Sequence, residues 1–287
     1  MNNVTVTICT LNEEKNIKEC LDSVIAENPD EIIVVDGDSS DQTRNIINQF
    51  NKSNIKLIHV EKKGLAYQRK IGIENVKTKY VCILDADHRL NKNCLNSLIK
   101  EMNEKKYSGI EASIQKFNSD KNYWNDCFDI NFLISHNTPG ETIMIGTPCI
   151  YLSEIVKKIN FDPFFTGPSD DTDLCYRLIK NGYKLGVGAA LINHKNRVSF
   201  LEFFNKMIWY GKGDAQFVYK HPERVHRMIY HQVINYPIIK NIKALQKGHI
   251  KSVPFFFLYG ILRFISMCFN LIKFSIKGTK DNNIQST

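Results

Sequence analysis

Acidic and hydroxyl side chains gather at three points of the chain, each directly after a short apolar segment. The three segments end in Thr10-Leu11-Asn12-Glu13, in Asp36-Gly37-Asp38-Ser39-Ser40-Asp41 and in Asp85-Ala86-Asp87. If the segments are parallel strands, their carboxyl ends meet at one edge of a sheet, which is where such sheets bind ligands. At least five carboxylates would converge there, and they would repel one another unless a cation or several hydrogen-bond donors lay among them.

Turns and helix caps offer a simpler explanation for some of these residues, because Asp and Ser are favoured at both. This explanation suits Asp41 and Ser40 well. It suits Asp85 and Asp87 poorly, because no helix is predicted to begin before about Asn91. Hard oxygen ligands without a neighbouring His and Cys set favour Mg²⁺ or Mn²⁺, and such an ion would hold a diphosphate and neutralise it as a leaving group.

The elements that position these side chains follow from the spacing of the apolar residues. We expect strands at 4–9, 31–35, 56–60 and 80–84, and helices at 14–26, 41–50, 65–75 and 91–104. Short apolar strands that alternate with helices predict an α/β fold, a doubly wound and mainly parallel sheet with helices on both faces. Further strands are predicted at 110–117, 184–187 and 191–193, a helix at 170–180, and only helices after Ser199.

Four sequence blocks in this order resemble glycosyltransferase family 2, whose fold is called GT-A. The blocks are 6–13, 33–43, the segment from Gly64 through Gly72 into 80–90, and Asp170-Asp171-Thr172-Asp173-Leu174 with Arg177-Leu178 and Gly182-Tyr183. In the third block Asp85-Ala86-Asp87 stands where the family has its DxD motif. The resemblance spans about residues 4–195.

The resemblance implies a role for each matching position. Thr10, Glu13 and Asp36 would line the base and ribose pocket, and Arg69 would face the nucleotide. Asp85 would approach the ribose or the metal, and Asp87 would be the principal metal ligand. The implied substrate-binding set is Thr10, Glu13, Asp36, Arg69, Asp85, Ala86 and Asp170. The chain departs from the family where many members have a second acid after Asp36 and this chain has Gly37, and where Lys70 and Asp170 replace a frequent Asn and Glu.

Asp171 matches the carboxylate that serves as general base in inverting members of the family. The helix expected at 170–180 supports a catalytic role independently, because Leu174, Cys175 and Leu178 form an apolar stripe and Asp171 lies at its start. Acids also favour helix N-termini for electrostatic reasons, and this explains Asp170 and Asp173 adequately. The hypothesis is an in-line displacement in which Asp171 accepts the proton of the acceptor hydroxyl while the diphosphate leaves.

His194 follows the last predicted strand and is another candidate ligand. It would reach the diphosphate or complete a metal shell formed by Asp85 and Asp87, giving the predicted metal set Asp85, Asp87 and His194. A lone histidine is more often a hydrogen-bonded structural residue, and that alternative stays open.

The charge of the chain is uneven along its 287 residues. The formal net charge is +8, of which the part from Lys195 onward carries +11 and the first 194 residues carry −3. An anionic partner is therefore expected to meet the C-terminal part. The eight cysteines form no CxxC pair and several lie in apolar strand-like segments, so we expect reduced core thiols in the cytosol. No secretory signal is recognised at the N-terminus.

A long apolar segment near the C-terminus suggests a membrane contact. Residues 252–272 contain one charge, Arg263, and polar residues recur at steps of three and four: Arg263, Ser266, Asn270, Lys273 and Lys277. One polar stripe on an apolar helix is typical of a helix in the membrane interface, and Lys240, Lys243, Lys247 and Lys251 would suit anionic headgroups. A helix packed on the catalytic domain and a true membrane span are the alternatives.

Together these observations predict a catalytic domain at 1–198 and a basic helical region at 199–287. The predicted function is a metal-dependent, inverting transfer from a nucleoside-diphosphate sugar to a hydroxyl of a glycan or lipid-linked acceptor. We expect Mn²⁺ or Mg²⁺ as cofactor, UDP rather than GDP as nucleotide, no nucleic-acid partner, and a peripheral location on the inner face of the membrane. The alternatives are a nucleotidyltransferase acting on a sugar phosphate, although residues 10–15 lack the usual glycines, and a non-catalytic membrane adaptor, although Asp85, Asp87 and Asp171 are all present.

Overall fold

The computed structural model describes residues 3–50, 52–61, 64–116, 122–135, 138–194 and 199–284. The side chains of 115, 116, 135, 194 and 277–284 are outside this description. The chain divides into two compact units. The first consists of Met1–Ser119, His136–Thr166 and Asp170–Asn196, and the second consists of Asp120–Ser135, Gly167–Ser169 and Arg197–Thr287.

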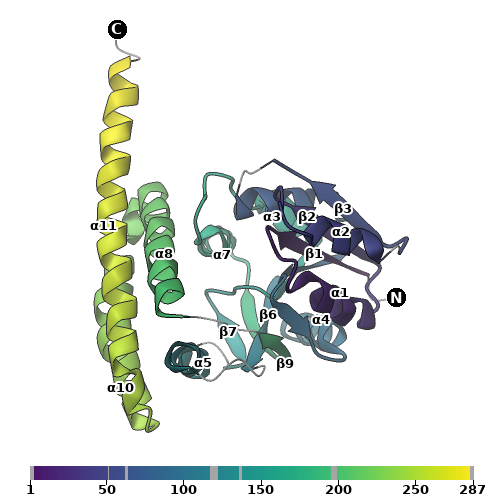
Figure 1. Ribbon diagram of the computed structural model, residues 1–287, viewed down its shortest axis with the longest axis horizontal. Coiled ribbons are helices and arrows are strands. Elements are labelled where there is room, and N and C mark those ends of the chain that lie inside the picture. Colours follow the sequence, from purple (N-terminus) through teal and green to yellow (C-terminus); the bar gives the residue numbers. More distant parts are fainter. Residues whose placement is uncertain are drawn as a thin grey trace. The chain divides into compact units, whose positions relative to one another are not determined.

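A mixed sheet of nine strands forms the centre of the first unit in the described residues (Figure 1). The strands are β1 (Val4–Thr10), β2 (Glu31–Asp36), β3 (Ile55–His59), β4 (Tyr80–Asp85), β5 (His88–Leu90), β6 (Gly109–Lys116), β7 (Gly140–Thr142), β8 (Cys149–Leu152) and β9 (Leu185–His194). Their order across the sheet is β3-β2-β1-β4-β8-β6-β9-β5, and β7 pairs with β9. The pairs β1–β2, β1–β4, β2–β3 and β6–β9 are parallel, so the predicted mainly parallel α/β sheet is confirmed.

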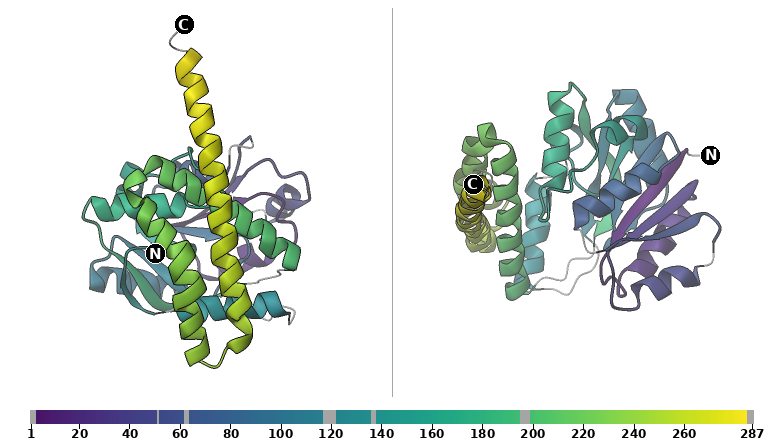
Figure 2. Two further views of the ribbon diagram at one scale, coloured as in Figure 1. Left: turned by 90° about the vertical axis from the view of Figure 1, so that its left-hand side faces the viewer. Right: turned by 90° about the horizontal axis from the view of Figure 1, so that it is seen from above.

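Helices cover both faces of this sheet (Figure 2). They are α1 (Ile17–Ala26), α2 (Thr43–Gln49), α3 (Leu65–Asn75), α4 (Cys94–Lys105), α6 (Ser153–Ile159) and α7 (Asp170–Lys180). The central strands are buried on both sides, and every residue of β1 is buried. Strands of this kind read as nearly continuous apolar runs, which is why the sequence located β1 to β4.

The register of the parallel strands brings the polar strand ends together. Thr10 at the end of β1 lies opposite Asp36 at the end of β2, and Cys9 lies opposite Asp85 at the end of β4. The sequence-based expectation that three separate segments deliver polar groups to one edge of the sheet is therefore confirmed. The pairing of the parallel strands thus brings these groups to the same edge.

The middle of the first unit differs from the sequence-based expectation. The segment after Asp87, predicted as a loop before a helix, contains the short strand β5, which pairs with β9. The two strands expected at 184–187 and 191–193 are one strand, β9, whose register to β6 shifts near Ser113. Strands β7 and β8 and helices α5 and α6 were not predicted. Strands β7 and β8 have only three and four residues, too few for a periodic pattern.

The second unit is helical. It contains α5 (Tyr123–Ser135), α8 (Phe200–Lys220), the short turn Pro222–Arg224, α9 (Val225–Tyr230), a π-helical segment His231–Lys240, α10 (Asn241–Gln246), the turn Ile250–Ser252 and α11 (Val253–Ile284). Its core is rich in aromatic side chains from α5, α8 and α11, including Phe128, Phe203 and Phe255. Besides the C-terminal helices, the second unit includes α5 and residues 167–169, and the predicted domain boundary between residues 198 and 199 stays a prediction.

The sequence predicts that the polar stripe of the C-terminal helix faces lipid headgroups, but Arg263 and Ser266 of this stripe face another helix. The Arg263 guanidinium pairs with both carboxylate oxygens of Asp214 on α8, at 2.7 and 2.9 Å. Ser266 is buried, and its hydroxyl donates to the Ile208 carbonyl at 2.7 Å. These two residues therefore face α8 rather than lipid headgroups, because a charge in an apolar setting is stable only beside a partner. The sequence of one helix does not reveal a partner 49 residues away.

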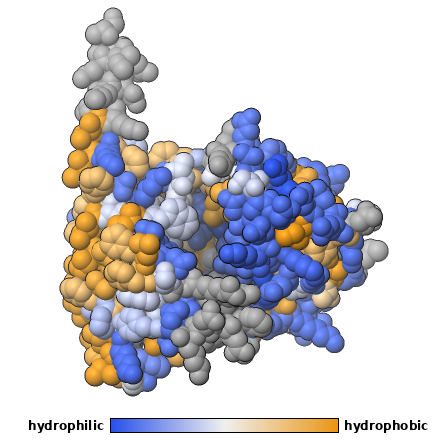
Figure 3. Space-filling model, viewed as in Figure 1, coloured by the Kyte–Doolittle hydropathy of each residue, from blue (hydrophilic) through white to orange (hydrophobic). Residues whose placement is uncertain are grey.

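The face of α11 opposite Arg263 is apolar and exposed. Its large residues are Ile265, Phe269, Ile272 and Ile276, each more than half exposed, at steps of four, three and four residues. Figure 3 shows hydrophobic colouring over the helices of this unit. Among the described residues one helical stretch, Ile250–Ile276, is long and apolar enough to cross a membrane by length and composition, and its mean hydropathy is 1.8.

Candidate active site

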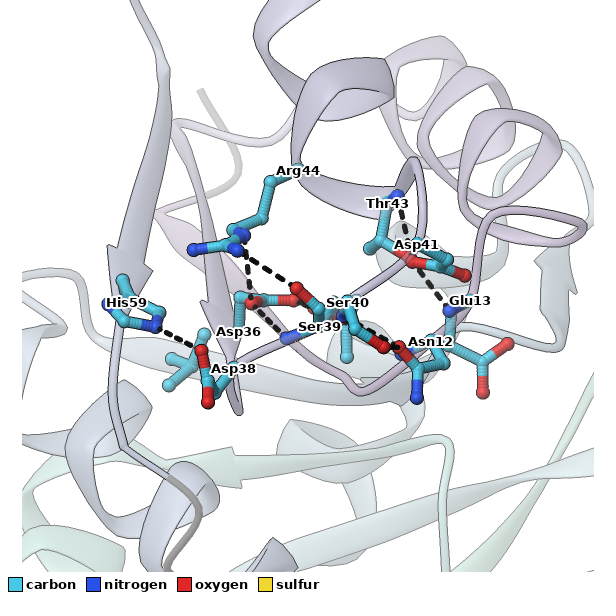
Figure 4. Close-up of polar contacts among 12 residues, drawn as sticks. Asn12, Glu13, Asp36, Asp38, Ser39, Ser40, Asp41, Thr43, Arg44 and His59 are labelled. Carbon is cyan, nitrogen blue, oxygen red and sulfur yellow. Dashed lines mark hydrogen bonds and ion pairs between the residues drawn. The ribbon is translucent and has the colours of Figure 1, made fainter.

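Polar contacts connect the loop that follows β1 with the loop that follows β2 (Figure 4). The Asp36 carboxylate accepts hydrogen bonds from the Thr10 hydroxyl (2.9 Å) and from the backbone N–H and hydroxyl of Ser39 (2.9 and 2.5 Å). Arg44 approaches the same carboxylate at 3.7 Å. Asp36 is completely buried, so it shapes the loop that lines the predicted nucleotide pocket and presents no exposed carboxylate there.

Glu13 and Asp41 complete the link between the two loops. The Glu13 backbone N–H donates to the Thr43 hydroxyl at 2.8 Å, and its carboxylate accepts a hydrogen bond from Asn16. Asp41 accepts from the Thr43 and Glu14 backbone N–H groups at 3.0 and 3.1 Å, which fits the turn explanation given for Asp41 above. Burial raises the pKa of Glu13. Burial is also the largest single influence on Asp41 and would raise its pKa, but the hydrogen bonds that Asp41 accepts from Thr43 and Glu14 together lower it.

Gln68 explains why this chain has glycine at position 37, where many family members have a second acidic residue. The buried Gln68 amide donates to the carbonyls of Thr10 and Val35, both at 2.9 Å, and so joins the ends of β1 and β2. A Cβ atom on Gly37 would lie 2.7 Å from the Gln68 nitrogen. The amide therefore occupies space that a side chain at position 37 would need. Next to it, Asp38 adopts a left-handed backbone conformation (φ 72°) and contacts His59 at 3.2 Å.

Arg69 is the cationic group that compensates the acidic strand ends. Its side chain is 4% exposed and pairs with Asp85 at 3.0 Å and with Asp170 at 2.8 Å. Burial alone would lower the pKa of Arg69, but the two carboxylates raise it well above its usual value. In turn, Arg69 lowers the pKa of Asp85 although burial opposes this. Arg69 thus joins α3, the end of β4 and the start of α7.

A group of potential metal ligands lies directly after β4. One ligand atom from each of Asp85, Asp87 and His88 can be chosen so that all lie within 4.8 Å of one another. Asp85 and Asp87 are partly exposed, whereas His88 is buried on β5. Two carboxylates and an imidazole fit a divalent cation such as Mn²⁺ or Mg²⁺, because carboxylate oxygens suit both ions and imidazole is compatible with a transition metal. His88 was missed in the sequence, although its position beside Asp87 was a usable signal.

The other predicted positions of this segment are placed as follows. Ala86 is buried, and its carbonyl accepts a hydrogen bond from Arg89 at 2.8 Å. His194 ends β9, where its backbone lies opposite His88. The His194 side chain lies outside the described residues, so its predicted ligand role stays a prediction.

Asp171 lies at the N-terminal end of α7 and is half-buried. Its Oδ1 accepts a hydrogen bond from the Thr172 backbone N–H at 2.6 Å, and its Oδ2 lies near Gly146, where an added Cβ would be 3.9 Å away. Burial raises the pKa of Asp171 to about 6, the negative charge of Asp170 adds to this, and Arg69 opposes it. Asp171 is thus a better proton acceptor than an exposed aspartate.

The chain is similar to known proteins in sequence and in fold. Residues 5–159 match the family model described as glycosyl transferase family 2. A relative from Methanococcus voltae is named dolichyl N-acetyl-alpha-D-glucosaminyl phosphate 3-beta-D-2,3-diacetamido-2,3-dideoxy-beta-D-glucuronosyltransferase. It is 27% identical over 252 residues, which cover 77% of this chain and 75% of the relative.

Two solved structures share the fold. The mannosyltransferase PcManGT from Pyrobaculum calidifontis, in complex with GDP-Man and Mn²⁺, has a TM-score of 0.69 at 17% identity and covers 94% of this chain and 87% of its own. Residues 1–349 of S. aureus TarS, in complex with UDP-GlcNAc, have a TM-score of 0.55 at 16% identity and cover 93% and 89%. The fold is therefore GT-A, and since the family model matches more than half of the chain, the protein belongs to glycosyltransferase family 2.

Proposed function

We propose that the protein transfers a sugar from a nucleoside-diphosphate donor to a hydroxyl of a glycan or lipid-linked acceptor, with inversion at the sugar carbon. The observation that carries this proposal is the pairing of Arg69 with Asp85 and Asp170. Through these contacts the carboxylates at the end of β4 and the start of α7 meet at one site. The proposed donor-side residue Asp85 and the proposed acceptor-side segment at Asp170 and Asp171 would then act within one cluster of charged side chains.

On the donor side, Asp85, Asp87 and His88 would hold the divalent cation. When bound, such an ion stabilises the charge that builds on the diphosphate. The loops carrying Thr10, Glu13 and Asp36 would hold the nucleoside, with Asp36 acting through the loop that it organises. PcManGT was solved with GDP-Man and TarS with UDP-GlcNAc, so both nucleotides occur on this fold. We keep UDP as the proposed nucleotide, with GDP as the alternative in a donor screen.

On the acceptor side, Asp171 is the proposed general base. Its raised pKa favours proton acceptance, and Oδ1 is engaged with Thr172 while Oδ2 lies near Gly146. In the proposed step, Oδ2 takes the proton of the acceptor hydroxyl and the oxygen forms a bond to the anomeric carbon. The bond between that carbon and the diphosphate oxygen breaks, and both electrons leave with the diphosphate.

A lipid-linked acceptor is supported by two observations. The name of the Methanococcus voltae relative specifies a dolichyl-phosphate-linked substrate for that protein. In this chain the helical unit exposes apolar side chains on α11 and carries exposed basic residues such as Lys247 and Lys251. We propose that this unit binds the cytoplasmic face of an anionic membrane. This contact would bring the enzyme to membrane-anchored acceptors.

The test is the variant Asp171→Asn, assayed with Mn²⁺ or Mg²⁺ and a panel of nucleotide sugars. We expect turnover to fall by about 10²- to 10⁴-fold, because a positioned general base contributes about this much, while donor binding stays within twofold of the wild type. The matched control is Asp22→Asn, which removes an exposed carboxylate of α1 that contacts Lys18. If the Asp171→Asn variant retained turnover, Asp171 would not be the general base. If the wild type stayed active in the presence of a metal chelator, the reaction would not require a divalent cation.

A further inference from the structure

The loop of residues 143–148, between β7 and β8, contacts three elements of the site. The Ile145 backbone N–H and carbonyl both contact the Cys175 sulfur on α7 at 3.4 Å. The Thr147 hydroxyl donates to the Asp85 carboxylate at the end of β4. Between them, the Gly146 N–H donates to Glu111 on β6 at 3.1 Å. We call this segment the bridging loop, because it links the helix that carries Asp171 to the donor-side carboxylate.

Gly146 lies near two carboxyl groups. A Cβ atom at this glycine would be 3.9 Å from Oδ2 of Asp171 and 3.9 Å from Oε1 of Glu111. Those two oxygens therefore lie no more than about 7.8 Å apart, which is the sum of the two distances. Glu111 uses its other oxygen, Oε2, for the hydrogen bond from the Gly146 N–H. The Glu111 carboxyl group thus holds the backbone next to the proton-accepting oxygen of Asp171.

Glu111 is unusual for its place in the sheet. It lies on a central strand between the buried residues Ile110 and Ala112 and is itself only 5% exposed. A buried carboxyl group costs folding free energy, so a purely structural position there would be better filled by an apolar residue. Burial raises the pKa of Glu111 to about 8, the charge of Asp171 adds to this, and the Gly146 hydrogen bond opposes it. At neutral pH the group is mainly a neutral acid.

We propose that Glu111 is a positioning residue of the transferase site, which fixes the bridging loop and with it the spacing between Asp171 and Asp85. The proposal rests on the proposed function for the role of Asp171. Glu111 itself acts through Gly146 and the loop, in its neutral form. Gln, which has the same shape and can accept from the Gly146 N–H, is then an adequate replacement, whereas Ala is not.

The charged and titratable groups around this site come from four elements. Asp170, Asp171 and Cys175 lie on α7, Arg69 on α3, Cys149 and Tyr151 on β8, and Glu111 on β6. Ionisation of Glu111 at alkaline pH would strengthen its hydrogen bond with the Gly146 N–H but place a second negative charge near Asp171, and the repulsion would move Asp171 from its position next to the bridging loop. The wild type should therefore lose kcat above about pH 8, and Glu111→Gln should not.

The experiment compares Glu111→Gln and Glu111→Ala in the full-length enzyme, with Glu101→Gln and Glu101→Ala as matched controls. Glu101 also accepts a backbone N–H, that of Ala189 at 3.0 Å, but lies on α4 away from the site. We expect Glu111→Gln to keep kcat within about threefold at pH 7 and to lose the alkaline fall. We expect Glu111→Ala to lose at least tenfold in kcat with an unchanged KM for the donor, and the controls to behave as the wild type.

Two outcomes would overturn the proposal. One is a Glu111→Ala enzyme whose kcat stays within twofold of the wild type, which would mean that the loop needs no support from Glu111. The other is a Glu111→Gln enzyme that is as slow as Glu111→Ala or keeps the alkaline fall, which would mean that a charge at Glu111 is needed or that another group titrates. If Glu111→Ala does not fold, the pH profile of Glu111→Gln decides. Failure of Asp171 as the base is detected separately, by turnover in Asp171→Asn.

Discussion

Asp170 and Asp171 are neighbours in the chain but differ in their electrostatic surroundings. The Asp170 carboxylate is buried and pairs with Arg69 at 2.8 Å. Asp171 accepts hydrogen bonds from the backbone N–H and the hydroxyl of Thr172, and its neighbour Asp170 repels a second negative charge. Two adjacent carboxyl groups with different environments can therefore take different roles, one holding the arginine and the other accepting a proton.

The pH dependence of turnover follows from this difference. The base must be ionised, and the pKa of Asp171 is raised to about 6, so its active form is lost as the pH falls through that value. We expect kcat/KM for the acceptor to be flat near neutral pH and to fall about tenfold for each pH unit well below 6. The measurement is initial rate against pH with saturating donor and low acceptor concentration.

The variant Asp170→Asn tests whether Asp171 is the group that controls the fall in rate at low pH. Removing the charge of Asp170 takes away a repulsion and also frees Arg69, and both changes lower the pKa of Asp171. The acid limb should therefore move to lower pH in any Asp170→Asn enzyme that folds. An acid limb that stays in place, or moves upward, would show that a group other than Asp171 controls it.

At the scale of elements, the ends of β1 and β2 are held together by a side chain from α3. The Gln68 amide bonds to both strands, and Gly37 lies directly against it. A side chain at position 37 would have to displace a buried amide that makes two hydrogen bonds. This packing gives a structural reason for glycine where many family members have an acid.

We therefore expect Gly37→Ala to destabilise the fold by about 2 kcal/mol, a typical cost of overpacking combined with a lost buried hydrogen bond. The midpoint of urea unfolding measures this effect. Gln68→Ala should also destabilise, but the double variant Gly37→Ala with Gln68→Ala should cost less than the sum of the two, because the clash disappears with the amide. Additive effects would contradict the proposed contact.

How far the sequence predicts these elements depends on the range of the interactions involved. Strands β1 to β4 and the polar loops after them were predicted correctly, because buried parallel strands and their ends have strong local patterns. Gln68 and Glu111 were missed, since each acts on backbone groups more than 30 residues away. The direction of Arg263 was wrong for the same reason: its partner Asp214 lies on a different helix.

At the scale of the whole molecule, the helical unit exposes more large apolar side chains than a solvated surface usually has. Ile265, Phe269, Ile272 and Ile276 form one stripe on α11, and Ile234, Ile238 and Ile242 lie exposed on the preceding helices. Extended apolar surfaces of this kind mark contacts with membranes or other proteins. The exposed Lys247 and Lys251 favour an anionic membrane.

We expect the protein to sediment with vesicles that contain anionic lipid and to bind less in high salt, which screens the lysines. Replacing Phe269 and Ile272 together by Ser should weaken binding at least tenfold, since burying each side chain is worth about 1.5 to 3 kcal/mol when complete. Leu191→Ser, which removes an exposed apolar side chain from β9, is the control.

The competing explanation for this surface is a second copy of the chain. It predicts a dimer whose mass depends on concentration and which the Phe269 and Ile272 substitutions dissociate, without binding to vesicles. Light scattering after gel filtration distinguishes the two. Vesicle binding that is unchanged by the substitutions would also contradict a lipid role for the α11 stripe.

The chain enters the helical unit three times, at 120–135, 167–169 and from 197 onward. On α5, the Trp124 ring stacks on Phe203 with centroids 4.6 Å apart, and Phe128 meets Phe255 at 5.1 Å. No single cut can therefore excise the catalytic half. A truncation after residue 198 would remove the aromatic rings that pack against α5 and expose the apolar side chains of this helix, which lies within the transferase sequence. A shortened enzyme for expression should therefore lack α5 or carry a redesigned α5.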